Sequence, residues 1–215
     1  MDFNIPSDKT DIVVAVSPGT KAALLLYLLS KYVHENSVDV TLRPVCEVAI
    51  DYEYHTIQQC NSILSYVKNK FPSVKIEDVR YIRKLTDNPT IPRKALKDAA
   101  IEYQSENSVN AIVMTGTTKV LELSYLEKIE KYHGATFDKI RYYIENAESL
   151  RVPNLGDWPY DYVFSEFTKA QIYEMYKTYD VEDLFDLTVS CDKHAGSECG
   201  TCFGCAERSY LENNV

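Results

Sequence analysis

The chain has 215 residues, 45% of them hydrophobic, which is enough for one well-buried core and does not demand a second large domain. Its formal net charge of −9 disfavours direct nucleic-acid binding, because proteins that contact the phosphate backbone need a basic stripe to displace counterions. The first residues lack the basic and apolar regions of a signal peptide, and the longest apolar run, 22–29, is too short to span a bilayer. We therefore expect a cytoplasmic protein with no membrane partner.

The first half of the chain alternates short β-branched runs with longer runs of helix formers. The expected elements, in order, are a strand at 11–16, a helix at 21–32, a strand within 38–50, a helix at 57–70 and a strand within 74–82. A loop at 86–92, a helix at 93–106 and a strand at 111–115 follow. Strands that alternate with helices predict an open, mainly parallel, twisted sheet with helices on both faces.

The second half is less regular. We expect a helix at 121–132, inside an otherwise irregular, aromatic-rich stretch that runs through Tyr142, Tyr143, Trp158 and Tyr160. Thr168 and Gln171 form a capping-box pattern, which predicts a helix that reaches about residue 179.

The loop that follows the first strand reads Ser17-Pro-Gly-Thr-Lys-Ala22. Right-handed crossovers place Ser17 and Thr115 at the same carboxyl edge of the sheet, where open parallel sheets bind their ligands. The loop leads into a helix N-terminus, whose free N–H groups and dipole attract anions. A Pro-Gly turn can also serve a purely geometric purpose here, and the hexapeptide alone leaves both interpretations open.

Four cysteines crowd into the last 25 residues: Cys191, Cys199, Cys202 and Cys205. Their spacing is typical of a tetrahedral zinc site built from C-x-x-C knuckles, in which the four thiolates close the coordination shell and the ion is structural. The alternatives are a disulfide pair, an iron–sulfur cluster or chance. His194 could replace one cysteine, although it is more simply a solvent-exposed residue. Cys46 and Cys60 have no partner motif and are predicted to be buried small apolar residues.

Taken together, these segments resemble the 7-cyano-7-deazaguanine synthases of the PP-loop ATP pyrophosphatase superfamily. That family carries S-G-G-x-D-S after the first strand, then P-x-R-N, I-x-x-G, a T/S-K-A-E/Q-I helix start, and a terminal C-x8-C-x-x-C-x-x-C zinc site. The matching segments here begin at Ser17, Ile91, Ile112, Phe167 and Cys191. The order agrees along nearly the whole chain, and the last two matches are the most specific.

The sequence departs from the family pattern mainly at the nucleotide loop. Pro18 replaces a glycine and so removes one N–H and forbids positive φ. Lys21 stands in place of the family's aspartate, Ala22 in place of a hydroxyl residue and Lys94 in place of an asparagine. The spacing from Cys191 to the next cysteine is one residue shorter than in the family.

The resemblance implies an adenine nucleotide alpha hydrolase-like, Rossmann-like domain over 1–186 and a zinc-binding tail over 187–215 within the same compact unit. It also implies a structural Zn²⁺ and, for an active enzyme, ATP and Mg²⁺. The nucleotide-binding residues it implies are Ser17, Gly19, Thr20, Lys21, Arg93, Thr115 and Gly116. Lys21 and Arg93 are the catalytic candidates, while Lys169 is interpreted as a first-turn surface residue.

Three functions remain in competition. The first is an ATP-dependent ligase that converts 7-carboxy-7-deazaguanine and ammonia to the nitrile in queuosine-type biosynthesis. The second is a protein that binds a nucleotide or purine-like ligand without turnover, because the loop is altered. The third is an iron–sulfur or zinc redox protein. A homodimer is left open.

Overall fold

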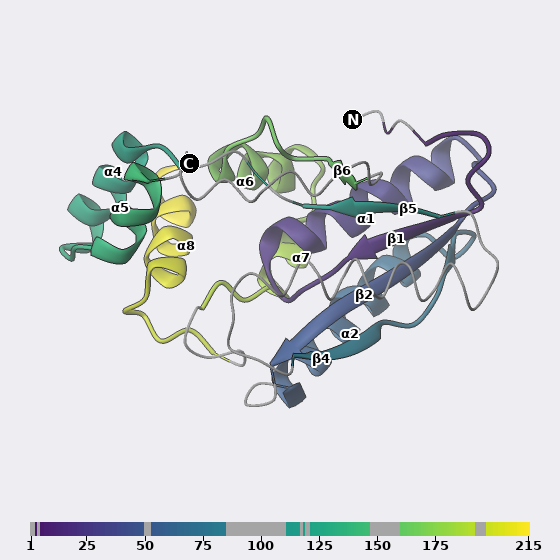
Figure 1. Ribbon diagram of the computed structural model, residues 1–215, viewed down its shortest axis with the longest axis horizontal. Coiled ribbons are helices and arrows are strands. Elements are labelled where there is room, and N and C mark those ends of the chain that lie inside the picture. The colour runs from purple at the N-terminus through teal and green to yellow at the C-terminus, as the bar shows by residue number, and fades with distance from the viewer. Residues whose placement is uncertain are drawn as a thin grey trace.

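The computed structural model describes residues 3, 5–49, 53–84, 111–116, 118, 121–146, 160–191 and 197–215. Within them, six strands form one sheet in which every described pairing is parallel (Figure 1). The strands are β1 (Asp11–Ala15), β2 (Thr41–Ala49), β3 (Lys75–Ile76), β4 (Arg80–Lys84), β5 (Ala111–Thr115) and β6 (Tyr160–Tyr162). Their order is β3-β2-β1-β5-β6, and β4 also pairs with β2.

The described helices are α1 (Thr20–Glu35), α2 (Glu53–Lys70), α4 (Leu123–His133), α5 (Asp138–Glu145), α6 (Lys169–Thr178), α7 (Glu182–Asp186) and α8 (Phe203–Asn214). Within the described residues, no helix is both long enough and apolar enough to cross a bilayer.

The central strands are buried on both faces, which explains their continuous runs of β-branched residues. On one face, Ile12 and Val14 join a large core with residues of α1 and α2. On the other, Val13 and Val113 belong to a second buried cluster and are at most 1% exposed. The parallel α/β class predicted from the sequence is confirmed.

Helix α1 is the central helix of the core. Its residues 22–30 are all buried, because α1 packs on the sheet and against α2, α6 and α7. A helix that is apolar on nearly all sides must be enclosed in this way. Burying each of its leucines contributes roughly 1.5–3 kcal/mol to the hydrophobic driving force.

Several predicted elements differ from the observed ones. The region 74–82 contains two short strands, β3 and β4, which pair with successive parts of β2. The prediction that Tyr142 and Tyr143 lie in irregular chain was wrong, because both lie in α5. The spacing of Ile140, Tyr143 and Ile144 gives this short helix one apolar face. Helices α7 and α8 were not predicted, and the predicted loop at 86–92 and helix at 93–106 lie outside the described residues.

Helices α4, α5 and α8 lie together at one end of the molecule, away from the sheet (Figure 1). Aromatic side chains join them: Tyr210 of α8 contacts Tyr125 and Tyr132 of α4 edge-on, and Phe203 contacts Phe137. The cysteine-rich tail therefore ends in a helix that packs on the middle of the chain.

Arg208 anchors α8 to the segment that follows α7. Its guanidinium donates to the carbonyl oxygens of Thr188 (2.8 Å) and Phe185 (3.3 Å), and it lies 4.1 Å from the centre of the Phe185 ring. Glu198 and Glu212 balance its charge. Because the side chain is only 9% exposed, these contacts form largely out of water, where they are strongest.

Replacing Arg208 should therefore cost substantial stability. We expect Arg208→Met to lower the free energy of unfolding by roughly 2–4 kcal/mol, because the carbonyl oxygens of Thr188 and Phe185 each lose a charged donor. Urea denaturation measures the change. The control is Arg83→Met, whose side chain is 68% exposed and pairs with Glu53, so its effect should stay below about 1 kcal/mol. Equal losses in both variants would contradict an anchoring role for Arg208.

Candidate functional site

The loop between β1 and α1 lies where the strand order of the sheet reverses. β2 pairs with one side of β1 and β5 with the other, so the connections that leave β1 and β5 diverge at their carboxyl ends. Doubly wound α/β proteins bind their ligands in the crevice that forms at such a point. The expectation that Ser17 and Thr115 follow neighbouring strands at one edge is confirmed.

The loop makes its turn without any left-handed residue. Gly19 is the N-cap of α1 with φ −76° and ψ 153°, and its N–H donates to the Ser17 hydroxyl oxygen at 3.3 Å. The loop requires no positive φ at Pro18, so the restricted φ of proline does not prevent the loop from forming. The N-cap supplies no side-chain cap to α1, and no acidic residue lies in the first turn. This leaves the helix dipole open to an external anion.

Gly116, at the end of β5, touches the first turn of α1. A Cβ built on Gly116 would lie 3.0 Å from the carbonyl oxygen of Lys21 and 3.1 Å from its carbonyl carbon. A side chain at this position would require the first turn of α1 to move by a few tenths of an ångström. The Lys21 ammonium lies 3.5 Å from the hydroxyl oxygen of Thr118, just beyond the same strand. The two predicted halves of the nucleotide site are therefore in direct contact.

Residues from the last third of the chain hold the loop from the other side. The backbone N–H of Val189 donates to the carbonyl oxygen of Pro18 at 2.9 Å. The Tyr176 hydroxyl, on a completely buried side chain of α6, donates to the carbonyl oxygen of Thr20 at 2.5 Å. Burial raises the pKa of Tyr176, so the hydroxyl stays protonated and remains a donor.

The four C-terminal cysteines converge on one point. Their Sγ atoms all lie within 4.8 Å of one another, and the individual separations include 3.5 Å from Cys202 to Cys205 and 3.9 Å from Cys191 to Cys202. All four are free thiols. A tetrahedron with metal–sulfur bonds of about 2.3 Å has edges of about 3.8 Å, so the cluster fits a single ion.

The local structure explains this convergence. Gly200 adopts φ +70°, which turns the chain back after Cys199, and Cys202 is the N-cap of α8. Hydrogen bonds from Thr201 hold the pKa of Cys199 down to about 5, while burial raises the pKa of Cys205.

The interpretation of Lys169 as a surface residue was wrong. Its ammonium pairs with the carboxylate of Glu207 on α8, which is 3% exposed, and lies 5.6 Å from the centre of the Phe203 ring. The capping box of Thr168 and Gln171 is confirmed and fixes the start of α6. The first turn of α6 thus binds the helix that carries two of the cysteines.

The remaining residues that the sequence analysis singled out lie outside the loop and the cysteine cluster as the structure describes them. Arg93 and His194 lie outside the described residues, so their roles stay predictions. Cys46 and Cys60 are buried as predicted, and their Sγ atoms lie 3.7 Å apart, a proximity that their sequence positions did not indicate. The importance of Tyr176 and Arg208 was also missed, because no local pattern distinguishes them from ordinary helix residues.

The fold and site define an α/β protein with a strand-to-helix loop at the sheet's switch point and a cluster of four cysteines that could hold a metal ion. No family model matches the chain, and no curated protein matches it in sequence. Among solved structures, the chain is similar to the NMN synthetase from Francisella tularensis, at 14% identity and a TM-score of 0.47, over 91% of this chain and 71% of that one. It is similar to the U34-tRNA thiolase NcsA from Methanococcus maripaludis with its [4Fe-4S] cluster, at 12% identity and a TM-score of 0.47, over 96% and 68%. These likenesses are too distant to assign a function, and the fold assignment rests on the strand order of this chain.

The cysteine cluster should bind one metal ion per chain. We expect Cys202→Ser to lower the bound metal below one ion per chain and to reduce thermal stability, because metal binding contributes to folding of the tail. Elemental analysis and thermal melts measure both effects. The control Cys60→Ala removes a buried thiol outside the cluster and should keep the full metal content. Unchanged metal in Cys202→Ser would remove this cysteine from the ligand set.

The close approach of Gly116 to α1 gives a second prediction. Gly116→Ala should displace the first turn of α1, cost about 1–3 kcal/mol of stability, and weaken nucleotide binding. The matched control is Gly19→Ala, where the added Cβ meets only the Ser17 hydroxyl oxygen at 3.4 Å and the backbone conformation suits alanine. Denaturation and calorimetric titration with ATP measure the two effects. Equal behaviour of the two variants would show that the Gly116 contact does not shape the loop.

Proposed function

We propose that the chain is an ATP-dependent enzyme of the PP-loop type that activates an acid group by adenylation. The observation that carries this proposal is the packing of Gly116 against the first turn of α1 at the switch point, which brings Ser17, Gly19, Thr20 and Lys21 together with the end of β5. The open N-terminus of α1 and the Lys21 ammonium together supply the positive potential that a polyphosphate needs.

Within this class, we propose the reaction of the 7-cyano-7-deazaguanine synthases. The carboxylate of 7-carboxy-7-deazaguanine attacks the α-phosphorus of ATP and releases pyrophosphate. Ammonia then displaces AMP and gives the amide. The amide oxygen then attacks the α-phosphorus of a second ATP and releases a second pyrophosphate, and loss of that oxygen as part of AMP, with loss of the nitrogen-bound protons, gives the nitrile. The support is the chain-wide order of sequence motifs, from the loop at Ser17 to the cysteines that begin at Cys191.

The chain's own contribution to this reaction is positioning and charge. The N–H groups at the start of α1 and the Lys21 ammonium can hold phosphate oxygens, and Arg93 is a further proposed anion ligand. Mg²⁺ would supply additional neutralisation of phosphate charge. Residues 17–21 contain no carboxylate, so this loop by itself does not fit a magnesium site, and no step is assigned to the ion.

We propose zinc as the resident metal of the cysteine cluster. Three of the sulfur pairs lie 3.5–3.9 Å apart and all four sulfurs lie within 4.8 Å of one another, which suits a single tetrahedral ion, whereas an iron–sulfur cluster places several iron and sulfide atoms between its thiolates. The ion would be structural, because four thiolates leave no open coordination position. Elemental analysis that finds iron in place of zinc, with visible charge-transfer absorption, would overturn this assignment.

The second candidate is a protein that binds a nucleotide without turnover, and the features that favour it are in the same loop. Pro18 removes one amide donor, and its carbonyl oxygen accepts from Val189. Lys21 replaces the acidic residue of the catalytic family pattern. Phosphate binding can survive these changes even if the catalytic arrangement does not.

One experiment separates the two candidates. Metal-loaded protein receives ATP, Mg²⁺, ammonia and 7-carboxy-7-deazaguanine, and the release of pyrophosphate and AMP is followed. An active ligase releases both in step with the nitrile, whereas a binding protein releases neither while calorimetry still detects ATP. If ATP neither binds nor reacts, the nucleotide proposal fails altogether.

Two substitutions of Lys21 test whether its ammonium group binds the phosphates of ATP. Lys21→Ala should weaken ATP binding by roughly 1.5–3 kcal/mol, the range for hydrogen bonds to charged groups. Lys21→Asp should weaken it at least as much, because a carboxylate would then face the phosphates. If Lys21→Asp instead gains pyrophosphate release over the parent protein, the loop is a disabled catalyst and the binding proposal holds. Calorimetry that shows equal ATP affinity in all three proteins would exclude Lys21 as a phosphate ligand.

A further inference from the structure

Arg208 of α8 contacts both the loop that carries the cysteines and the segment that leads back to the nucleotide loop, residues 17–21. Its guanidinium donates to the carbonyl oxygens of Thr188 at 2.8 Å and Phe185 at 3.3 Å. Its Nε atom also lies 3.1 Å from a carboxylate oxygen of Glu198, which directly precedes Cys199 in the cysteine cluster. Arg208 is therefore a junction between two parts of the molecule that carry different candidate sites.

The first route from Arg208 to the nucleotide loop follows the backbone. The carbonyl and hydroxyl oxygens of Thr188 both accept from the guanidinium, at 2.8 and 3.1 Å, and Thr188 is buried. The next residue is Val189, whose N–H donates to the carbonyl oxygen of Pro18 at 2.9 Å. Because Thr188 and Val189 are consecutive, a shift of the Arg208 guanidinium moves the donor that holds Pro18.

The second route passes through buried aromatic rings. The guanidinium carbon of Arg208 lies 4.1 Å from the centre of the Phe185 ring, and the Tyr176 ring contacts Phe185 edge-on at 5.3 Å. The Tyr176 hydroxyl then donates to the carbonyl oxygen of Thr20 at 2.5 Å. All three side chains of this route are buried, and a close-packed interior transmits a displacement from one group to the next.

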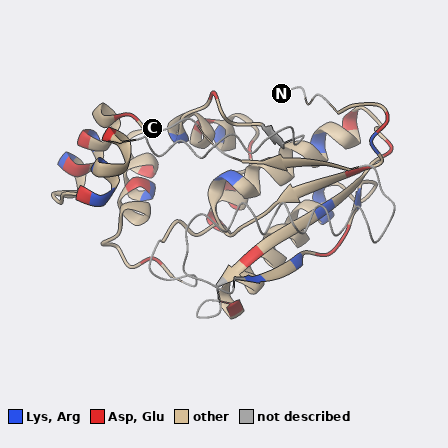
Figure 2. Ribbon diagram, in the orientation of Figure 1, with Lys and Arg blue, Asp and Glu red and all other residues tan. Residues whose placement is uncertain are grey.

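A long-range electric field does not provide an alternative to these contacts. Figure 2 shows basic and acidic residues interspersed over α4, α5 and α8, so the charges at this end of the molecule largely cancel. Salt further screens exposed charges that are more than about 10 Å apart at moderate ionic strength. Any influence of the cysteine cluster on the nucleotide loop therefore has to travel through short-range contacts such as the two routes.

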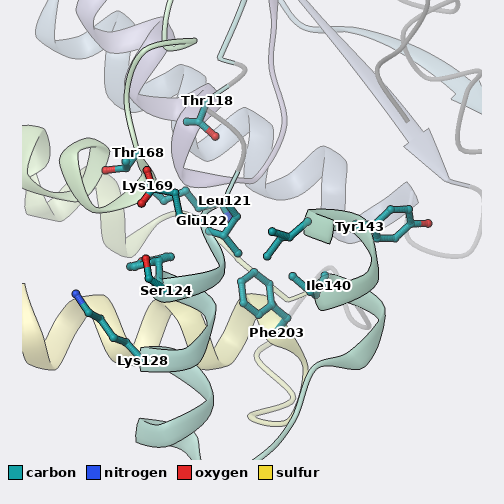
Figure 3. Close-up of a pocket in the computed structure, with 12 residues that line it drawn as sticks. Thr118, Leu121, Glu122, Ser124, Lys128, Ile140, Tyr143, Thr168, Lys169 and Phe203 are labelled. Atoms are coloured by element: carbon teal, nitrogen blue, oxygen red, sulfur yellow. The ribbon is translucent and has the colours of Figure 1, made fainter. Parts of the chain in front are cut away.

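The first turn of α8 has free volume beside it. A cavity of about 400 Å³ lies between helices α4 and α5 and the first turns of α6 and α8 (Figure 3). Phe203, which follows Cys202, lines this cavity together with Lys169 of α6, and Thr118 lies at the end opposite Phe203. A close-packed helix end cannot shift, whereas one beside a cavity can. An ion at the four cysteines would therefore restrict a turn that packing alone leaves room to move.

From these contacts we infer that Arg208 is a positioning residue that couples the two sites, so that a metal ion at the cysteines and an anion at the nucleotide loop each strengthen the binding of the other. Joining the four thiolates fixes the start of α8, Arg208 then holds Thr188 and Phe185, and the two routes hold the carbonyl oxygens of Pro18 and Thr20. Such coupling is reciprocal and usually amounts to about 5- to 150-fold in affinity. The identity of the anion as ATP rests on the proposed function, whereas the coupling rests on the contacts.

The first test uses the full-length, zinc-loaded protein and two matched substitutions. Tyr176→Phe keeps the ring against Phe185 and removes only the donor to Thr20. The control Tyr81→Phe also removes a hydroxyl that donates to a backbone carbonyl oxygen, that of Ile57 at 3.2 Å, outside both routes. Competition with a chromogenic chelator, under conditions in which circular dichroism shows both variants folded, measures Zn²⁺ affinity. It should be weaker by at least about five-fold in Tyr176→Phe and unchanged in Tyr81→Phe.

The second test addresses the junction itself. Arg208→Lys keeps the positive charge, but one ammonium cannot replace a planar guanidinium that engages two carbonyl groups. Calorimetry on the zinc-loaded proteins should show ATP affinity at least about five-fold weaker in Arg208→Lys than in the parent. Saturating ATP should in turn tighten Zn²⁺ binding by the parent by a similar factor, and by less in Arg208→Lys. Direct binding of Zn²⁺ by ATP would lower the apparent affinity, so it cannot imitate this gain.

The outcomes separate this inference from the proposed function. If Tyr176→Phe weakens Zn²⁺ binding more than Tyr81→Phe does but ATP never binds, the coupling stands and the nucleotide proposal falls. If the two tyrosine variants bind Zn²⁺ equally well, or if bound ATP leaves the Zn²⁺ affinity of the parent unchanged, the inference is overturned. Equal ATP affinity in Arg208→Lys and the parent would remove Arg208 as the positioning residue. A parent protein that binds no Zn²⁺ would remove the metal site and the inference together.

Discussion

The first turn of α1 is held between two parts of the chain, and the candidate site depends on this constraint. On one side Gly116, which follows β5, packs against the backbone of Lys21 so closely that an added Cβ would lie 3.0 Å from the Lys21 carbonyl oxygen. From the other side, the Tyr176 hydroxyl and the Val189 N–H engage the carbonyl oxygens of Thr20 and Pro18. These contacts engage carbonyl groups of the loop and none of its N–H groups.

The same contacts connect the cysteine cluster to the nucleotide loop. Val189 lies two residues before Cys191, and the segment that contains it is bound by Arg208 of α8. Helix α8 begins at the cluster, because Cys202 is its N-cap and Cys205 lies in its first turn. An ion held by the four thiolates would therefore join Cys191, which follows Val189, to the start of α8. The cysteine cluster is in this way linked through Val189 to the loop that follows β1.

Helices α4, α5 and α8 give the chain a second compartment beside the parallel sheet. Lys169 and Glu207 link the start of α6 to α8 at its wall, and Thr118 connects the compartment to the loop. A switch point of this kind is common to many α/β proteins, so the sheet by itself does not specify what this chain does.

The sequence by itself determined the parallel α/β class, the positions of β1, β2, β5, α1, α2 and α6, and the set of four cysteines. These follow from local physics: β-branched runs, helix formers, a capping box, and closely spaced thiols at a glycine turn. Only the tertiary structure decided that Gly116 packs against the first turn of α1, that Lys169 pairs with a buried carboxylate, and that Arg208 anchors α8. Each of these depends on a partner from a different element of the chain, and no local sequence pattern reveals which distant residues the fold brings together.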